Sequence, residues 1–351
     1  MPGDRSPHEA APHGAAPDED VAPEDDAEPA RPNLIDRTAD RVDAIQRRIP
    51  PVAIVFAVTK KYGEDRGGQL AMLLAYKGFF SLFPLLLAFV TLLGLLLSGN
   101  PELRDDLINS TLASIPVVGT EVISDTGQID GSVLVLVGAV LVSLWAGLGL
   151  LDMLQEALNT VWDVVQHERP PWIIRRLRDV PGAILIALCA IASGAGRWLL
   201  ADGASDALRW IVAALLAVLA GAAAYLGLHL LLCARSVPMR SHLPGAIATG
   251  LGWWGLQALG GWYVTRFVRD SSDTYGVFVV VLGLLSWTYL LGMMYLYSVE
   301  LAAVLHERRW PRSLSGRDLT DADLAAFGAL SEREARVPGT EIDVTVPRDP
   351  Q

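Results

Sequence analysis

The sequence has little of what disulfide or metal chemistry requires. It contains only two cysteines and six histidines in 351 residues. Cys189 and Cys233 both lie inside apolar runs, which predicts small core residues and not a disulfide framework. The histidines are scattered along the sequence and form no His-Glu-x-x-His or comparable motif. Metal-dependent nuclease chemistry therefore has no visible set of ligands.

Other enzyme signatures are also missing. The sequence has no Gly-x-x-x-x-Gly-Lys-Ser/Thr motif, so ATP-driven chemistry is not indicated. No Ser/His/Asp arrangement can be argued from the spacing of these residues. We therefore expect no enzyme activity, no cofactor, no metal and no nucleic-acid partner.

Apolar residues are abundant, at 52% of the sequence, and they gather in long runs. Each run is near or above the roughly 20 residues that a helix needs to cross a hydrocarbon core about 30 Å thick. The pattern predicts an all-α polytopic membrane protein with six transmembrane helices. The runs cover residues 70–98, 132–151, 181–200, 208–233, 243–265 and 275–305.

Basic residues are distributed unevenly around these runs. Seventeen Lys and Arg residues flank the runs on one side, whereas the alternate connections hold only five. Lys and Arg near the ends of transmembrane segments are retained in the cytoplasm, which predicts that both termini are cytoplasmic. The first apolar run begins only at Leu70, after an acidic stretch, so no cleavable secretory signal is expected. The predicted location is the bacterial cytoplasmic membrane.

The regions outside the apolar runs predict four parts of the chain. Residues 1–33 are acidic and poor in large apolar side chains, which predicts a disordered tail. Residues 34–68 form a juxtamembrane segment in which 52–62 is expected to be an amphipathic cytoplasmic helix. Residues 69–309 form the six-helix transmembrane domain. Residues 310–351 are expected to be mostly disordered, with a short helix at 319–332.

Three stretches of the chain carry a family resemblance. They are Leu74-Ala-Tyr-Lys-Gly-Phe-Phe-Ser-Leu-Phe-Pro84, then Glu156-Ala-Leu-Asn-Thr-Val-Trp162, and finally Pro244-Gly-Ala with Thr274-Tyr-Gly and Ser298-Val-Glu300. In this order among six apolar runs, they resemble the YihY/BrkB family of bacterial inner-membrane proteins, formerly misfiled as ribonuclease BN. Lys77 stands where that family has an aromatic or small residue.

This resemblance covers residues 52–309 and omits both tails. It implies a six-helix protein of the inner membrane. Roles attributed to the family are the movement of envelope lipids or solutes and virulence-related resistance.

Four ionisable residues lie near the predicted cytoplasmic ends of the apolar runs. They are Lys77, Asp152, Glu156 and Glu300. Charges at membrane depth are costly and often functional, so one interpretation is a polar vestibule in which Lys77 pairs with Glu300 or Asp152. The alternative is four separate charges solvated among lipid headgroups, with Lys77 reaching the interface along its own helix.

A second candidate is a kink in the first run. Pro84 has no backbone N–H, which leaves the carbonyl of Phe80 without its helical partner and predicts a kink. We expect the Ser81 hydroxyl or a neighbouring helix to compensate. Ser81 and Pro84 are therefore candidates for a gate.

Two further groups carry alternative interpretations. Gly245, Thr249 and Gly252 share one helix face, which favours close packing inside one subunit over a seam between two copies. On the predicted external side, the arginines suit either an anionic headgroup or local pairing with nearby aspartates. These candidate anion contacts are Arg197, Arg266 and Arg269.

These observations lead to one preferred function and two alternatives. The preferred function is a transporter without ATPase activity, which moves an envelope lipid or a small solute and has membrane lipids as partners. The first alternative is a non-catalytic envelope scaffold associated with virulence. The second is an intramembrane enzyme that uses Asp152 and Glu156 for acid–base chemistry.

Overall fold

The computed structural model describes residues 42–96, 133–195, 205–263 and 277–340, apart from 47, 315, 317 and 318, together with 342 and 345. The secondary structure of these described residues is entirely helical, which confirms the predicted all-α fold. Within the described residues two segments are long and apolar enough to cross a membrane, Asp206–Leu232 and Val281–Glu307, so the count of six transmembrane helices stays a prediction. The predicted tail 1–33 lies outside the described residues.

The helices follow the predicted runs. Each run coincides with one long helix, because a run of this length and apolarity favours a helix that satisfies its own backbone hydrogen bonds. In chain order the elements are α2 (Pro50–Glu64), α3 (Gly67–Leu96), α5 (Val133–Val161), the 3-10 helix η2 (Gln166–Glu168), α6 (Trp172–Ala195), α7 (Asp206–Leu232), α8 (Met239–Tyr263), α10 (Val277–Glu307) and α11 (Asp321–Arg333).

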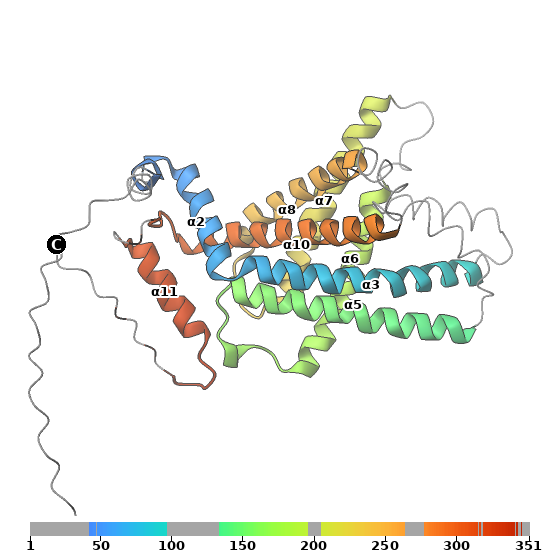
Figure 1. Ribbon diagram of the computed structural model, residues 1–351, viewed down its shortest axis with the longest axis horizontal. Helices are drawn as coiled ribbons and strands as arrows, with labels where there is room; N and C mark the ends of the chain where they lie inside the picture. The colour runs from blue at the N-terminus through green and yellow to red at the C-terminus, as the bar shows by residue number, and fades with distance from the viewer. Residues whose placement is uncertain are drawn as a thin grey trace, which may run out of the picture.

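The six long helices form a closed ring. α5 packs on α3, α3 on α10, α10 on α8, α8 on α7, α7 on α6, and α6 again on α5. Both α5 and α10 also contact each other across the ring. α2 and α11 lie outside the ring, together at one end of the molecule (Figure 1).

The outer surface of the ring is apolar. Every one of the six helices carries an exposed leucine, and other large apolar side chains are exposed beside them. An apolar exterior on every helix is unfavourable in water and is the pattern of a protein surrounded by hydrocarbon. The six leucines are Leu73, Leu141, Leu188, Leu215, Leu251 and Leu282.

A helix, α2, covers the segment 52–62, where an amphipathic cytoplasmic helix was predicted. It begins with two prolines, which suit a first turn whose N–H groups have no helical partner. Ala53 and Ala57 are buried, and α2 packs against α10, whereas Val52 and Val55 are exposed on its other face. The last turn of α2 is therefore held at the end of the ring.

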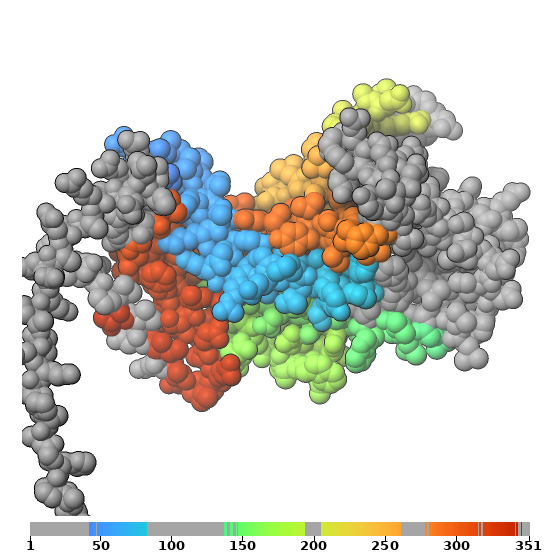
Figure 2. All heavy atoms as spheres, viewed as in Figure 1, coloured from blue at the N-terminus to red at the C-terminus, as the bar shows by residue number. Residues whose placement is uncertain are grey.

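The segment after α10 contains a helix where a short one was expected, at 319–332. This helix is α11, which lies beside α2 and α3 in the space-filling view (Figure 2). The Thr320 side chain and the Asp323 side chain cap the first turn reciprocally. Arg312 and Ser313, which precede α11, are almost fully buried. The start of α11 is therefore held by specific polar contacts, since its sequence has few large apolar residues to pack.

Candidate functional site: a buried chain of charges

One end of the helix ring contains a group of buried charged side chains. At its centre is Lys61, in the last turn of α2, whose side chain is only 3% exposed. Its ammonium group donates hydrogen bonds to Asp65 Oδ2 and, at 2.8 Å, to the carbonyl oxygen of Val161. The same Nζ lies 3.4 Å from Glu300 Oε2. Lys61 therefore joins the end of α2 to both α5 and α10.

Arg333, the last residue of α11, extends this group. Its Nη1 lies 2.6 Å from Asp65 Oδ1 and 3.4 Å from Asp163 Oδ1. The same nitrogen donates a hydrogen bond to the carbonyl oxygen of Thr160 at 3.0 Å. Asp163 also accepts a hydrogen bond from Arg309 Nη1 at 2.6 Å. These contacts join α11 to the turn after α2 and to the end of α5.

The group reaches the surface beyond Arg309. Arg309 Nε lies 2.9 Å from Glu307 Oε2, and Glu307 Oε1 lies 2.7 Å from Arg235 Nη1. The Arg235 side chain is 41% exposed, whereas that of Glu300 at the other end is 0% exposed. We call this series the ion chain; in order of contact it consists of Glu300, Lys61, Asp65, Arg333, Asp163, Arg309, Glu307 and Arg235.

Negative and positive residues alternate along the whole ion chain. Each interior charge therefore has two neighbours of opposite sign, which offset the cost of removing it from water. Burial by itself would lower the pKa of Lys61. The attraction of the neighbouring carboxylates, Glu300 first and then Asp65 and Asp163, outweighs burial and raises that pKa above its usual range. Lys61 is therefore charged at physiological pH.

Glu300 depends on a single cation. Its side chain is fully buried, and neither carboxylate oxygen accepts a hydrogen bond from the part of the chain that the structure describes. The nearest cation is Lys61 at 3.4 Å. Separating α2 from α10 would leave this carboxylate buried without a counter-charge.

A second group of polar contacts holds the start of α11. Asp323, which is fully buried, lies 2.8 Å from Lys60 Nζ and 2.7 Å from Arg312 Nε. Its carboxylate also accepts hydrogen bonds from the backbone N–H groups of Ser313 and Thr320. Burial by itself would raise the pKa of Asp323, but these donors hold that pKa well below its usual range. α11 is therefore fixed to α2 at its start, and to the turn after α2 and the end of α5 at its last residue.

Two of the predicted vestibule residues have cations from the α5–α6 connection and α6 as partners. Asp152 Oδ1 lies 2.7 Å from Arg175 Nη2, and Glu156 accepts a hydrogen bond from Arg169. Arg175 Nη1 is also 3.7 Å from Glu156 Oε2. These side chains are partly exposed, so they form a separate group that joins α5 to α6.

The structure does not bring Lys77 to Glu300 or Asp152, the pairing that the first of the two interpretations required. Among the described residues Lys77 makes no ion pair, and its Nζ lies beside Gly149 of α5, 3.9 Å from the position that a Cβ would take there. Lys77 is partly exposed. The sequence placed these groups at a similar depth, but depth does not determine in which direction around a helix each side chain points.

The candidate kink and the external arginines are only partly described. α3 continues as one helix from Gly67 to Leu96, and the Ser81 hydroxyl donates to the Gly78 carbonyl oxygen at 2.7 Å. That contact differs from the expected compensation of Phe80. The side chain of Pro84 lies outside the described residues, so a kink and a gate there stay predictions. The same holds for the anion contacts of Arg197, Arg266 and Arg269.

The small residues of α8 lie at close approaches within one chain. A Cβ at Gly252 would lie 2.7 Å from Met294 Cγ of α10, and one at Gly245 would lie 2.6 Å from the Ser298 carbonyl oxygen of the same helix. Both values are shorter than real Cβ contacts allow. Thr249, between them, is buried. These positions permit α8 and α10 to approach closely.

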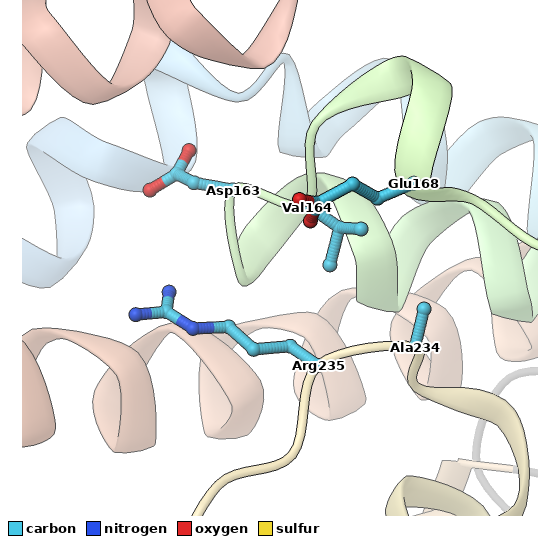
Figure 3. A pocket seen from close by; sticks show the side chains of 5 residues that line it. All are labelled: Asp163, Val164, Glu168, Ala234 and Arg235. Carbon is cyan, nitrogen blue, oxygen red and sulfur yellow. The ribbon is translucent and has the colours of Figure 1, made fainter. Parts of the chain in front are cut away.

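A small pocket of about 150 Å³ opens beside the outer end of the ion chain. It is lined by Asp163, Val164, Glu168, Ala234 and Arg235. Figure 3 shows Asp163 and Arg235 on facing sides of this pocket. Solvent therefore reaches the ion chain at the end opposite to Glu300.

Sequence reasoning missed most of the ion chain. Lys61, Asp65 and Asp163 stand in polar stretches that read as ordinary solvated segments, and Arg333 lies in the predicted tail. It also missed a grouping of histidines: the rings of His229, His242 and His306 all lie within 6.3 Å of the Trp162 ring. Among the described residues no three His, Cys, Asp or Glu side chains form a group that could hold a metal ion.

Comparisons with known proteins assign this chain to a family. The family described as virulence factor BrkB matches residues 58–321, which include all of the ion chain except Arg333. The chain belongs to the BrkB family. The predicted resemblance to YihY/BrkB proteins is thus confirmed, and the chain is a membrane protein of this family.

Two curated relatives illustrate the family. YfkH of Bacillus subtilis (strain 168), whose name describes it as ribonuclease-like, is 28% identical over 71% of this chain and 94% of its own length. The inner membrane protein YhjD of Escherichia coli (strain K12) is 26% identical over 45% of this chain and 50% of its own length. No solved structure matches this BrkB-family chain.

Proposed function

We propose that this BrkB-family protein is a membrane translocator and that the ion chain is its cytoplasmic gate. In this proposal all six long helices cross the membrane, and the ring that they form surrounds the route of an envelope lipid or a small solute. α2 and α11 close the route at one end. The gate acts without ATP hydrolysis.

The ion chain is the observation that carries this proposal. Replacing a buried ion pair by apolar residues is often neutral or stabilising, so buried charges contribute little to stability alone. Here they join α2 and α11, outside the ring, to the ends of the ring helices α5 and α10. Such contacts between separate elements form or break as a unit, which is the behaviour of a two-state switch.

The distribution of basic residues supports a cytoplasmic position for this gate. The ion chain lies at the end of the ring that carries Lys61, Arg235 and Arg309. The basic side of the apolar runs is retained in the cytoplasm. A cytoplasmic position for both termini follows from the same argument, because α2 and α11 lie at this end (Figure 1).

This orientation can be tested with two cysteines at opposite ends of α7. Ala207, in the first turn of α7, and Ser236, four residues after its end, are both exposed. In intact cells or spheroplasts, a membrane-impermeant maleimide is expected to label Ala207→Cys, and Ser236→Cys only after permeabilisation. Each variant is the control for the other. Labelling of Ser236→Cys in intact spheroplasts would reverse the orientation.

Transport itself can be tested in proteoliposomes. The variant Lys61→Met/Glu300→Gln removes both charges of one buried pair and so weakens the attachment of α2 to α10. Loss of about 1.4 kcal/mol from the closed state changes its population ratio tenfold, so we expect about tenfold faster flux. The measurements are dithionite bleaching of a fluorescent phospholipid and release of a small fluorescent solute.

The matched control for this experiment is Asp152→Asn/Arg175→Met. This variant removes an ion pair from the same end of the molecule that does not belong to the ion chain. It is expected to give the flux of the unmodified protein. If neither lipid nor solute moves with any variant, the translocator proposal is wrong, and a scaffold becomes the better interpretation.

A further inference from the structure

A buried cluster of aromatic and histidine side chains lies inside the ring next to the ion chain. Tyr225 and His229 of α7 have ring centroids 4.1 Å apart, and His229 lies 4.7 Å from His242 of α8. Tyr295 of α10 lies 5.8 Å from Tyr225, and Trp162 lies 5.1 Å from His242. We call these five residues the inner cluster. Four elements of the ring domain thus contribute to it.

The polar atoms of the inner cluster are not satisfied by the protein. Within the described residues, Trp162 Nε1, Tyr225 OH and Tyr295 OH are buried and have no hydrogen-bond partner. The same is true of His229 Nε2 and His242 Nδ1. Buried polar atoms in native proteins are nearly always paired, with protein groups or with bound molecules. Five such atoms in one place are the observation from which a bound guest is inferred below.

The identity of these atoms defines the chemistry of the guest. His229 Nδ1 lies 2.9 Å from the Tyr225 carbonyl oxygen and donates to it, so His229 Nε2 presents a lone pair. The indole N–H of Trp162 is a donor, and the two phenol groups both donate and accept. The inner cluster contains no carboxylate, ammonium or guanidinium group. It therefore suits an uncharged guest that donates and accepts hydrogen bonds.

The backbone of α8 leaves space for one of these groups. Gly245 faces the Tyr225 hydroxyl so closely that a Cβ at this position would collide with it. One helical turn further along the same face, the Thr249 hydroxyl is also buried without a partner in the described part of the chain. The polar lining thus continues along α8 beyond Tyr225.

Trp162 connects the inner cluster to the ion chain. Its carbonyl oxygen accepts a hydrogen bond from Arg235 Nη1 at 2.9 Å, whereas its indole ring packs against His242 and His306. Arg235 is the outer end of the ion chain. Trp162 therefore lies between the ion chain and the inner cluster.

We propose that the inner cluster binds hydroxyl-bearing neutral molecules, either water or the hydroxyl groups of a polyol solute, inside the ring. This inference rests on the proposed function only in placing the cluster on the translocation route. The binding chemistry itself follows from the five unsatisfied atoms and from the Thr249 hydroxyl.

Deleting single hydroxyl groups distinguishes an occupied cluster from a dry one. Tyr225→Phe and Tyr295→Phe remove one oxygen each and keep the rings. If the hydroxyls bind guest molecules, each variant is expected to lower the melting temperature in detergent, because a hydrogen bond is lost. If the cluster is dry, removing an unsatisfied oxygen raises the melting temperature, which would overturn the proposal. Tyr76→Phe, at an exposed tyrosine of α3, is the control.

Water access can be measured separately with a cysteine at Thr249. In a background with Cys189→Ala and Cys233→Ala, Thr249→Cys is compared with Ala220→Cys. Ala220 is equally buried but lies about 140° around α7 from Tyr225. We expect a small water-soluble methanethiosulfonate to modify Thr249→Cys at least about tenfold faster, since a dry site reacts only after local opening.

Modification rates measured in the presence of a polyol distinguish water from a polyol as the bound guest. Slower modification in glycerol than in an excluded polymer of equal osmolality assigns the site to polyol hydroxyls, and fast modification in both assigns it to water. The proposal would be overturned if Thr249→Cys and Ala220→Cys were modified equally slowly. The same slow modification would have to be seen when each cysteine is combined with Lys61→Met/Glu300→Gln. Fast modification without flux in proteoliposomes would instead contradict only the translocator function.

Discussion

Lys61→Met is expected to cause the largest loss of stability of any single substitution in the ion chain. The change leaves Glu300 and Asp65 as buried carboxylates without their shared cation. Removing one partner of a buried ion pair costs roughly 3–5 kcal/mol. The melting temperature in detergent should therefore fall by many degrees, and the measurement is thermal unfolding of the purified protein.

Lys77→Met is the matched control for this substitution. Lys77 is partly exposed and makes no ion pair among the described residues, so its replacement should cost less than about 1 kcal/mol. Lys61→Met combined with Glu300→Gln should recover part of the loss, because the buried carboxylate is then neutral. An equal loss from Lys77→Met, or strict additivity in the double variant, would contradict the assignment of Lys61 as the partner of Glu300.

Asp323→Asn is expected to release α11 from the rest of the protein. The change removes the negative charge that Lys60 and Arg312 share, and it converts one accepting oxygen into a donor. A loss of about 3 kcal/mol corresponds to a change of about 100-fold in the docking equilibrium. Limited proteolysis of the C-terminal segment, followed by mass spectrometry, should become correspondingly faster. Asp321→Asn, at an exposed residue of the same turn, is the control and should leave the protection unchanged.

The pH dependence of this docking follows from the pKa of Asp323. Because that pKa is lower in the folded protein than in the unfolded chain, the contribution of Asp323 is fully present above the usual Asp range. It declines progressively as the pH falls below the unfolded value and is fully lost once the pH has fallen through the depressed folded value. α11 should therefore stay protected from proteolysis through the pH range in which ordinary aspartates become protonated. Release near pH 4 would show that the hydrogen bonds to Asp323 are not formed in solution.

The long helices and their polar ends could be predicted from the sequence. The runs at 208–233 and 275–305 form α7 and α10, because the length and apolarity of such a run favour a helix whatever it packs against. Asp152, Glu156 and Glu300 also lie at the ends of their runs as expected, since depth follows from the constant rise of a helix.

The partners of those residues could not be predicted. Glu300 faces Lys61 because α10 packs against α2 as well as α3, and the order of helices in the ring is decided by contacts between segments far apart in the sequence. Lys61 itself stands next to Lys60 in a short amphipathic segment, where two adjacent lysines normally indicate a solvated surface. Only the tertiary arrangement shows that one of them is buried.

For α11 the sequence predicted the helix but not its docking. Its composition is polar and poor in large apolar residues, so apolar burial gave no reason to expect that the helix is held in place. The four-residue capping pattern from Thr320 to Asp323 was visible as a signal for the start of a helix. Its docking depends on a few charges, Asp323 and Arg333 among them, whose partners lie in α2 and after α5. Average composition carries no information about such individual contacts.

The closed order of the six long helices has a consequence for assembly. Because α6 returns to α5, the six long helices of the described chain close on themselves within one polypeptide. In channels built from several subunits, by contrast, each copy contributes only a sector of the wall, and an isolated copy encloses nothing. If the proposed translocator function is correct, association of copies would therefore change the number of routes in a membrane, and each copy would keep its own.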